Sequence, residues 1–216
     1  MVDYTKYELK SGEELTTLLT GKDNLFLVAC NKCFKEFDTV QEPEVEQVAA
    51  LAASLGKTVT GTAQVSFLCN QVQTEKKLAS LIPQGTENVV VISCGLGVQT
   101  VADLASVPTF TATNSLNYTG HHGMALTQKT CGACAQCYLN VTGGICPITA
   151  CSKSLVNGPC GGTKNGKCEV CPDMECGWER IIQRLKAQGR LDVLKCPTQI
   201  HDFNTDEATK SAKESE

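Results

Sequence analysis

The sequence predicts an α/β fold in which a small parallel-sheet domain, Rossmann-like or flavodoxin-like, is followed by an irregular cysteine-rich metal-binding segment and a C-terminal helix. Short apolar runs alternate with amphipathic segments through the first half of the 216 residues, as in strands separated by helices. Ten of the 14 cysteines come after residue 130. An amphipathic segment with the single tryptophan follows the clustered cysteines.

The first two expected elements are a short helix and a buried strand. Ser11 and Glu14 have the spacing of a capping box, and Gly21 would end the helix that they begin. The apolar run Asn24–Ala29 predicts a buried strand that closes at Cys30.

A second helix and strand follow. Pro43 opens a helix that Gly56 stops. Its apolar face consists of Val45, Val48, Ala49, Ala52 and Leu55. The β-branched run Lys57–Val65 predicts the next strand, and Thr74 can cap a helix that continues to Leu81.

The domain is completed by a strand over Asn88–Ser93, a helix over Val98–Ala105 and a strand over Pro108–Ala112. Strands that alternate with helices predict a parallel sheet with helices on both faces.

Four early cysteines lie at or just past the carboxyl ends of predicted strands: Cys30, Cys33, Cys69 and Cys94. Open α/β sheets bind ligands at this edge, so we expect an all-cysteine metal site there. In the alternatives, Cys69 and Cys94 are small buried hydrophobic residues, or the Cys30/Cys33 pair is a thioredoxin-like redox motif. The Cys94–Gly97 turn lacks the third glycine of a dinucleotide fingerprint, so we interpret it as a tight turn that brings backbone close to a cluster or ligand.

The later segment is expected to fold around metal. Its cysteines are interleaved with glycine pairs, and aliphatic residues are too few for a core. We expect eight of them to be ligands: Cys131, Cys134, Cys137, Cys146, Cys151, Cys160, Cys168 and Cys176. The triple Cys-x-x-Cys-x-x-Cys favours iron–sulfur clusters, with four-thiolate zinc as the rival. The sequence does not allot the ligands to sites, and Cys171 and Cys196 are left out.

The expected division is an α/β domain over 1–118, the cysteine-rich segment over 119–176, a docking helix over 177–201 and a disordered tail over 202–216. The helix has Trp178, Ile181, Ile182 and Leu185 on one side and a stop at Gly189; core packing is its commoner role. The adjacent His121 and His122 are expected to face solvent.

Composition excludes several classes of protein. A net charge of −4 argues against nucleic-acid binding, and no apolar run approaches the length of a membrane span. We do not expect the charged start up to Thr20 to act as a signal peptide. We therefore expect a cytoplasmic chain whose cysteines bind metal and do not form disulfides.

Several motifs resemble one known family. The segment Gly143–Gly162 (GGICPITACSKSLVNGPCGG), Gly166–Val170 and Cys176–Trp178 closely resemble the methylenetetrahydrofolate reductase C-terminal domain family, whose stand-alone members are MetV-type small iron–sulfur subunits of acetogen-type bacteria. The Cys30/Cys33 pair and the turn from Cys94 look similar too. Cys171 stands where the family is expected to have another residue.

The resemblance implies an accessory electron-transfer subunit in the methyl branch of the Wood–Ljungdahl pathway. It would carry two or more 4Fe-4S clusters, with zinc as a possible further metal, and dock on a flavin-containing MetF-type subunit; some systems add an Rnf-C-like NADH-binding subunit. Flavin is expected on the partner, because this chain is shorter than a folate-reducing barrel of about 250 residues. The alternatives are a structural zinc or cluster subunit, and a subunit that binds a methyl acceptor such as a corrinoid protein.

Overall fold

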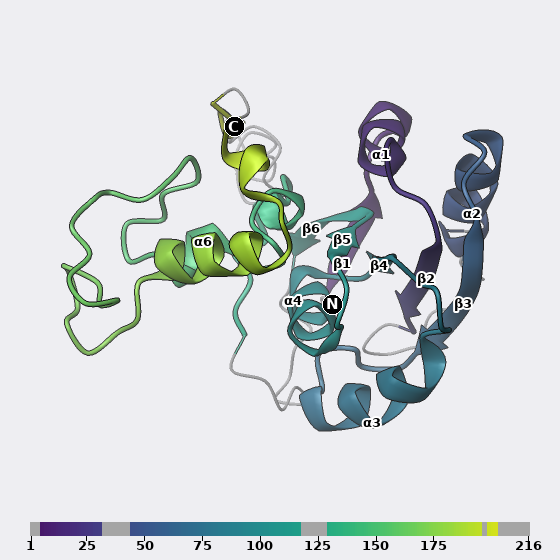
Figure 1. The fold of residues 1–216 in the computed structure, drawn as a ribbon, viewed down its shortest axis with the longest axis horizontal. Helices are drawn as coiled ribbons and strands as arrows, with labels where there is room; N and C mark the ends of the chain where they lie inside the picture. The colour runs from purple at the N-terminus through teal and green to yellow at the C-terminus, as the bar shows by residue number, and fades with distance from the viewer. Residues whose placement is uncertain (1–4, 32–43, 118–128, 196–197, 203–216) are drawn as a thin grey trace, which may run out of the picture.

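A computed structural model of the chain describes residues 5–31, 44–117, 129–195 and 198–202. Its main sheet is parallel and has the order β3-β2-β4-β5 (Figure 1). The strands are β2 (Leu25–Cys30), β3 (Val59–Val65), β4 (Asn88–Ile92) and β5 (Thr109–Thr111). Taken in chain order, the first of these strands lies between the second and the third, as in flavodoxin-like sheets. The predicted α/β class is confirmed.

Helices cover both faces of this sheet, as predicted. The helices are α1 (Gly12–Leu19), α2 (Glu44–Ser54), α3 (Gln71–Leu81) and α4 (Gly95–Leu104). Successive residues of β2 point to opposite faces, so Leu25 and Leu27 pack with α1 and α2, whereas Phe26 and Val28 pack with α3 and α4. Strand β2 is therefore buried on both faces.

Two helices begin earlier than predicted. Helix α3 begins at Gln71 because Asn70 caps it: the Asn70 side chain accepts the Gln73 N–H at 3.1 Å. Thr74 is inside the helix and buried, and its hydroxyl donates to the Leu68 carbonyl. Helix α4 begins at Gly95, directly after Cys94, and not at Val98.

A second sheet was not predicted. Strand β1 (Lys6–Leu9) pairs antiparallel with β6 (Thr113–Asn117), which follows the last strand that the sequence predicted. Thr113 and Asn114 are buried although polar, because each makes hydrogen bonds inside the fold; the Thr113 hydroxyl donates to the Ser93 carbonyl. Polar composition concealed this strand.

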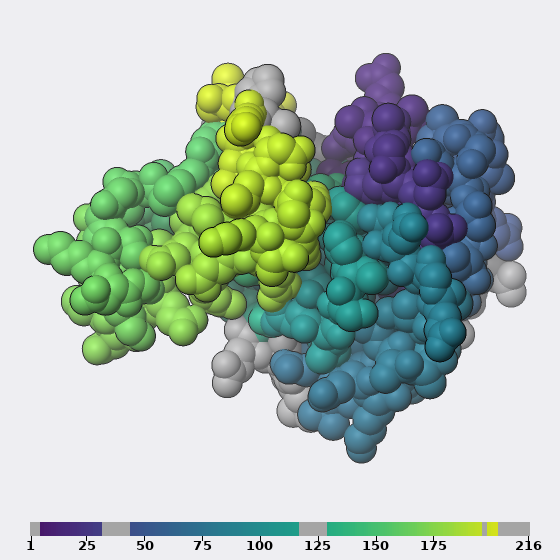
Figure 2. Space-filling view, in the orientation of Figure 1, coloured from purple at the N-terminus to yellow at the C-terminus, as the bar shows by residue number. Residues whose placement is uncertain are grey.

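The C-terminal region packs beside the sheet domain (Figures 1 and 2). It contains α5 (Pro147–Ala150), α6 (Gly177–Ala187) and the short 3₁₀ helices η2 (Tyr138–Asn140) and η3 (Leu191–Lys195). Trp178, Ile181 and Leu185 are buried together with Ile145, so the apolar side of α6 packs into a core as expected. The loops between α5 and α6 project away from the sheet.

Some predictions fall on residues outside the described ranges: Cys33, Pro43, His121, His122, Cys196 and the tail from 203. Across the described part of the chain, no helix combines the length and apolar character that a bilayer span requires.

Candidate metal centre

The structure separates the described candidate ligands into three groups. The first lies at the carboxyl edge of the main sheet: Cys30 ends β2, Cys69 lies between β3 and α3, and Cys94 lies between β4 and α4. All three are buried, and Cys69 and Cys94 share a small apolar cluster with Leu96, against which Cys131 packs. Because β2 and β4 are neighbouring strands, Cys30 and Cys94 flank the point where the strand order reverses.

The environment of this first group disfavours thiolates without a compensating cation. Burial raises the pKa of Cys94, and the nearby Cys30 and Cys131 raise it further, while N–H groups of Gly97 and Leu96 act against that rise. The structure therefore brings three of the four early cysteines to one edge, and a charged form of the group needs a positive partner such as a metal.

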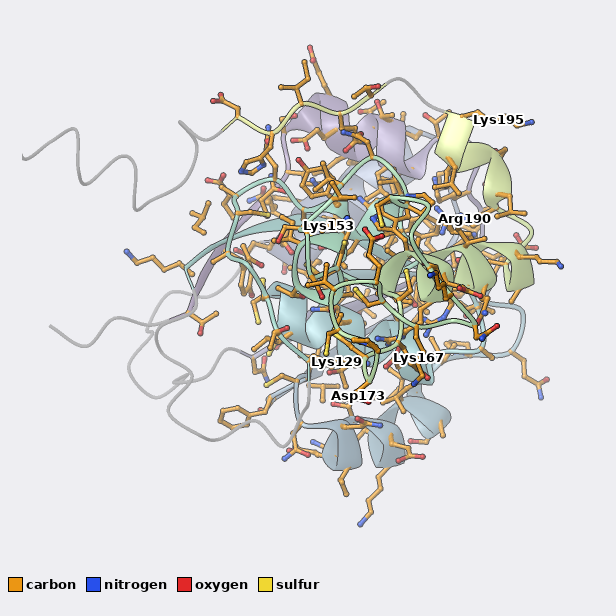
Figure 3. The ribbon with its side chains drawn as sticks, turned by 90° about the vertical axis from the view of Figure 1, so that its left-hand side faces the viewer. Lys129, Lys153, Lys167, Asp173, Arg190 and Lys195 are labelled. Carbon is orange, nitrogen blue, oxygen red and sulfur yellow. The ribbon has the colours of Figure 1, made fainter. Side chains whose placement is uncertain are left out.

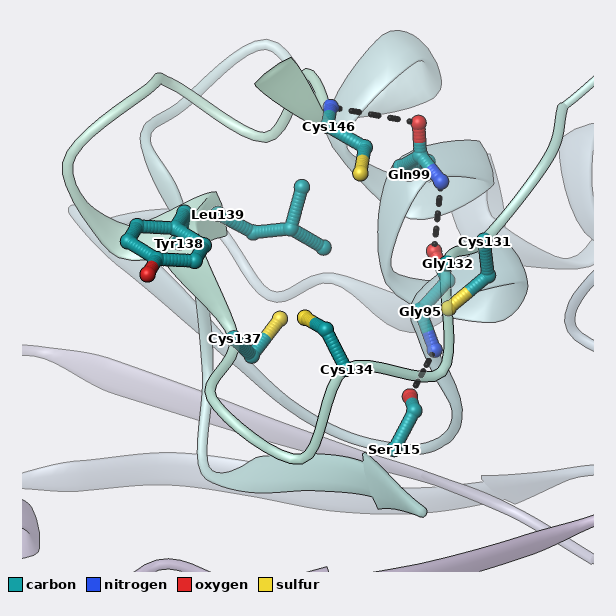
Figure 4. Close-up of a pocket in the computed structure, with 10 residues that line it drawn as sticks. All are labelled: Gly95, Gln99, Ser115, Cys131, Gly132, Cys134, Cys137, Tyr138, Leu139 and Cys146. Carbon is teal, nitrogen blue, oxygen red and sulfur yellow. Dashed lines mark hydrogen bonds between the residues drawn. The ribbon is translucent and has the colours of Figure 1, made fainter. Parts of the chain in front are cut away.

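The second group is a four-thiol set at one pocket (Figure 4). It consists of Cys131, Cys134, Cys137 and Cys146, and we call it the inner set. The Cys134 and Cys137 sulfurs point toward one another, and those of Cys131 and Cys146 turn toward the same space. Helix α4 supplies another wall through Gly95 and Gln99. A side chain on Gly95 would place its Cβ 2.8 Å from the Cys131 sulfur, so only glycine fits there without displacing that sulfur.

Gln99 ties the two ends of the inner set to α4. It is buried, and its amide nitrogen donates to the carbonyl of Thr130, next to Cys131, at 2.8 Å. Its amide oxygen accepts the N–H of Cys146 at 3.3 Å. One side chain of the sheet domain thus fixes the backbone next to Cys131 and at Cys146, the first and last cysteines of the set.

Burial raises the pKa of three thiols of the inner set. Burial raises the pKa of Cys137 to about 12, although the Leu139 N–H and the Lys10 ammonium act against it. Burial also raises the pKa of Cys134 to about 11 and that of Cys131 above its ordinary value. These thiols are therefore neutral near pH 7 until a cation offsets the charge of their thiolates.

The third group is a second four-thiol set in the projecting loops, and we call it the outer set: Cys151, Cys160, Cys168 and Cys176. Lys153, labelled in Figure 3, lines the same pocket and forms an ion pair with Glu169. The pKa of Cys168 is lowered, first by the Ser152 hydroxyl and then by neighbouring backbone N–H groups. The outer set is more exposed than the inner set, because Cys160 is exposed and no inner-set cysteine is. Cys171 is exposed and lines neither pocket.

A single helical turn separates the two sets. Cys146 occupies the N-cap position of α5 and belongs to the inner set, and Cys151 occupies the C-cap position and belongs to the outer set. At 1.5 Å per helical residue, the Cα atoms of these two cysteines are within about 8 Å along the helix axis. Any centres held by the two sets are therefore close neighbours.

The thiols of each set surround a pocket without closing on one point. Within the described ranges, no three His, Cys, Asp or Glu side chains are placed so that they could hold a metal ion together. The nine cysteines from Cys131 to Cys176 are free thiols.

The residues that contain both sets also match a known family. Residues 110–204 match the family model described as methylene-tetrahydrofolate reductase C terminal. The chain carries a domain related to the methylenetetrahydrofolate reductase C terminus. A search of curated proteins and a search of solved structures each found no match.

This reductase-related domain contains all eight cysteines of the inner and outer sets. Sequence reasoning named these eight residues but left them unassigned to sites. It also missed Gln99, Lys10 and Asn114 beside the inner set. Gln99 lies five residues after Cys94 in a segment already noticed for its glycines, whereas Lys10 is more than 100 residues from the thiols and carried no signal.

Proposed function

We propose that this chain is an accessory electron-transfer subunit of a methylenetetrahydrofolate reductase, with iron–sulfur clusters on its cysteine sets. One observation carries the proposal: two four-cysteine sets lie at the two ends of one helical turn. The family match of residues 110–204 supplies the enzyme context. A pair of closely spaced all-thiol sites is the arrangement that an electron route requires.

The donor chemistry of both sets fits such clusters. Each set is made of four cysteines, the ligand set of 4Fe-4S clusters and also of structural zinc. When bound, a cluster supplies one-electron redox chemistry. The chain's own part is to hold and orient the thiolates: the Ala133 N–H donates to the Cys131 sulfur at 3.4 Å, and Gln99 fixes the backbone beside Cys146.

The partner we propose is a flavin-containing MetF-type subunit that reduces methylenetetrahydrofolate in the methyl branch of the Wood–Ljungdahl pathway. An Rnf-C-like NADH-binding subunit or another electron-donating protein would complete the complex. The early cysteines Cys30, Cys33, Cys69 and Cys94 are proposed as a further metal site. Cys30 and Cys94 support it by flanking the strand-order reversal, where open α/β sheets bind ligands.

A structural role is the second candidate, and one observation favours it. From 151 to 176 the only buried residue is Cys176, so this lobe has no hydrophobic core of its own. A metal at the outer set would then serve to fold the lobe, as structural zinc does in small domains. The two candidates differ in whether electrons pass through the sets.

Cys134→Ser in the assembled reductase complex separates the two candidates. We expect flavin reduction by the reduced electron-donating protein to slow by about tenfold or more in complex of normal composition, because the route loses one centre. Rapid-mixing absorbance of the flavin measures that rate, and Cys171→Ser is the matched control because Cys171 lines neither pocket. Less complex with an unchanged rate would contradict electron transfer and support the structural role.

A further inference from the structure

Lys10 is a buried lysine at the edge of the inner set. It follows β1 and precedes the helix cap Ser11, and only 8% of it is exposed. Lysine is almost never this buried unless its charge is paired, because removing an ammonium from water is costly. Its position therefore needs a partner that repays this cost.

Asn114 connects Lys10 to the inner set. The Lys10 ammonium donates to the Asn114 side-chain oxygen at 2.7 Å, and the same oxygen accepts the Cys137 N–H at 3.0 Å. The ammonium therefore lies within about 6 Å of the Cys137 backbone nitrogen, the span of two hydrogen bonds. Strand β6, which contains Asn114, brings these distant parts of the chain together.

Glu14 does not account for this burial. It accepts from Lys10 at 3.0 Å, but 48% of its side chain is exposed, so a lysine in solvent could form the same i,i+4 pair without being buried. Glu14 also serves the helix cap by accepting the Ser11 N–H. A second source of negative charge would explain the inward placement of the ammonium. Cys137 becomes such a source when a metal converts its thiol to a thiolate, because its backbone N–H shares the Asn114 oxygen with Lys10.

We propose that Lys10 is the fixed positive charge of the inner set, a positioning residue that stabilises its four thiolates and raises the reduction potential of the centre they hold. The claim about the reduction potential rests on the proposed function, because it requires a bound cluster. The claim that Lys10 stabilises the thiolates does not. Reduction adds negative charge, so a nearby cation favours the reduced form, and its effect is large in a buried setting where water does not screen it. The outer set has Lys153 instead, an exposed lysine already paired with Glu169.

A redox titration of the metal-loaded full chain tests the potential. The EPR signal of the inner set is identified as the one that Cys134→Ser abolishes. We expect Lys10→Met to lower the ratio of reduced to oxidised centre, read from that signal at a fixed potential, about tenfold, which is equivalent to about −59 mV for one electron. Lys10→Arg should keep the wild-type value.

Glu14→Gln is the matched control, because it removes the opposing charge while glutamine still fits the capping box. It should shift the potential upward, by less, since Glu14 is half exposed. An unchanged reduction potential in Lys10→Met would overturn the proposal. Shifts of the same sign in Lys10→Met and Glu14→Gln would also overturn it, because an electrostatic effect must reverse with the sign of the charge that is removed, whereas structural damage need not.

A cobalt(II) titration of the unloaded chain tests the thiolate stabilisation without iron. We expect Lys10→Met to weaken the inner-set affinity for cobalt about tenfold or more, read from thiolate-to-cobalt absorption, while Lys153→Met leaves the inner set unchanged. Equal affinity in wild type and Lys10→Met would overturn the inference even where a cluster is present. A wild-type chain that takes up no iron or sulfide but shows the cobalt difference would contradict the proposed function alone.

Discussion

At the scale of single residues, Asp103 joins the sheet domain to the C-terminal helix. It lies in α4, accepts from the Arg184 guanidinium of α6 at 2.8 Å and forms an ion pair with Lys129. Arg184 also donates to the Ala102 carbonyl, so the contact is anchored at two points. Burial alone would raise the pKa of Asp103, but these hydrogen bonds outweigh it and hold the pKa below its ordinary value of 3.8.

Asp103→Asn should destabilise the fold by about 1–3 kcal/mol near neutral pH, because Arg184 and Lys129 lose a charged acceptor. A lowered carboxyl pKa contributes stability that is complete above the ordinary value and is lost as pH falls through the folded-state value. The stability difference between wild type and Asp103→Asn should therefore narrow below about pH 4. Denaturant unfolding across a range of pH measures this difference in the free energy of unfolding. A difference that stays constant down to strongly acidic pH would contradict this account.

At the scale of elements, α5 and α6 touch through a glycine. A Cβ on Gly177 would lie 2.3 Å from the carbonyl oxygen of Ala150, the last residue of α5. Because that atom belongs to the backbone, a side chain at 177 must push the two helices apart. Cys151 and Cys176 are the neighbours of these two residues, so the contact sets the spacing of half the outer set.

Gly177→Ala should destabilise the fold by about 1–3 kcal/mol through this overpacking, even though alanine is the better helix former by about 1 kcal/mol. Gly12→Ala is the matched control: Gly12 also begins a helix, but nothing lies within 4 Å of its added Cβ, so we expect a change within about 0.5 kcal/mol. Urea unfolding measures both. A neutral Gly177→Ala would mean that the helices are not in close contact.

The elements that sequence could predict are those with a strong local signal. The continuous apolar runs of β2 and β4 and the stripe with Trp178, Ile181 and Leu185 in α6 need no distant partner to be recognised. Strands β1 and β6 were not predicted, because they pair across more than 100 residues and because β6 buries polar side chains. Helix α3 began early because Asn70, and not Thr74, provides the cap.

At the scale of the whole molecule, the sheet domain positions cysteines that belong to a different part of the chain. Helix α4 presents Gly95 and Gln99 to the inner set, and Lys10 reaches it from the first strand. Composition and spacing were enough to single out the eight cysteines that line the two pockets. Their allotment to an inner and an outer set could not be predicted, because it depends on how α5 separates Cys146 from Cys151.

Iron, zinc and acid-labile sulfide per chain, with EPR before and after reduction, test the central claim most directly. Anaerobically purified wild type should contain about eight or more irons with matching sulfide and gain a signal on reduction. Cys134→Ser should lose the iron and sulfide of the inner set, and Cys168→Ser those of the outer set. Cys171→Ser should lose neither iron nor sulfide. Zinc with little sulfide, or a single substitution that empties both sets, would contradict two separate redox centres.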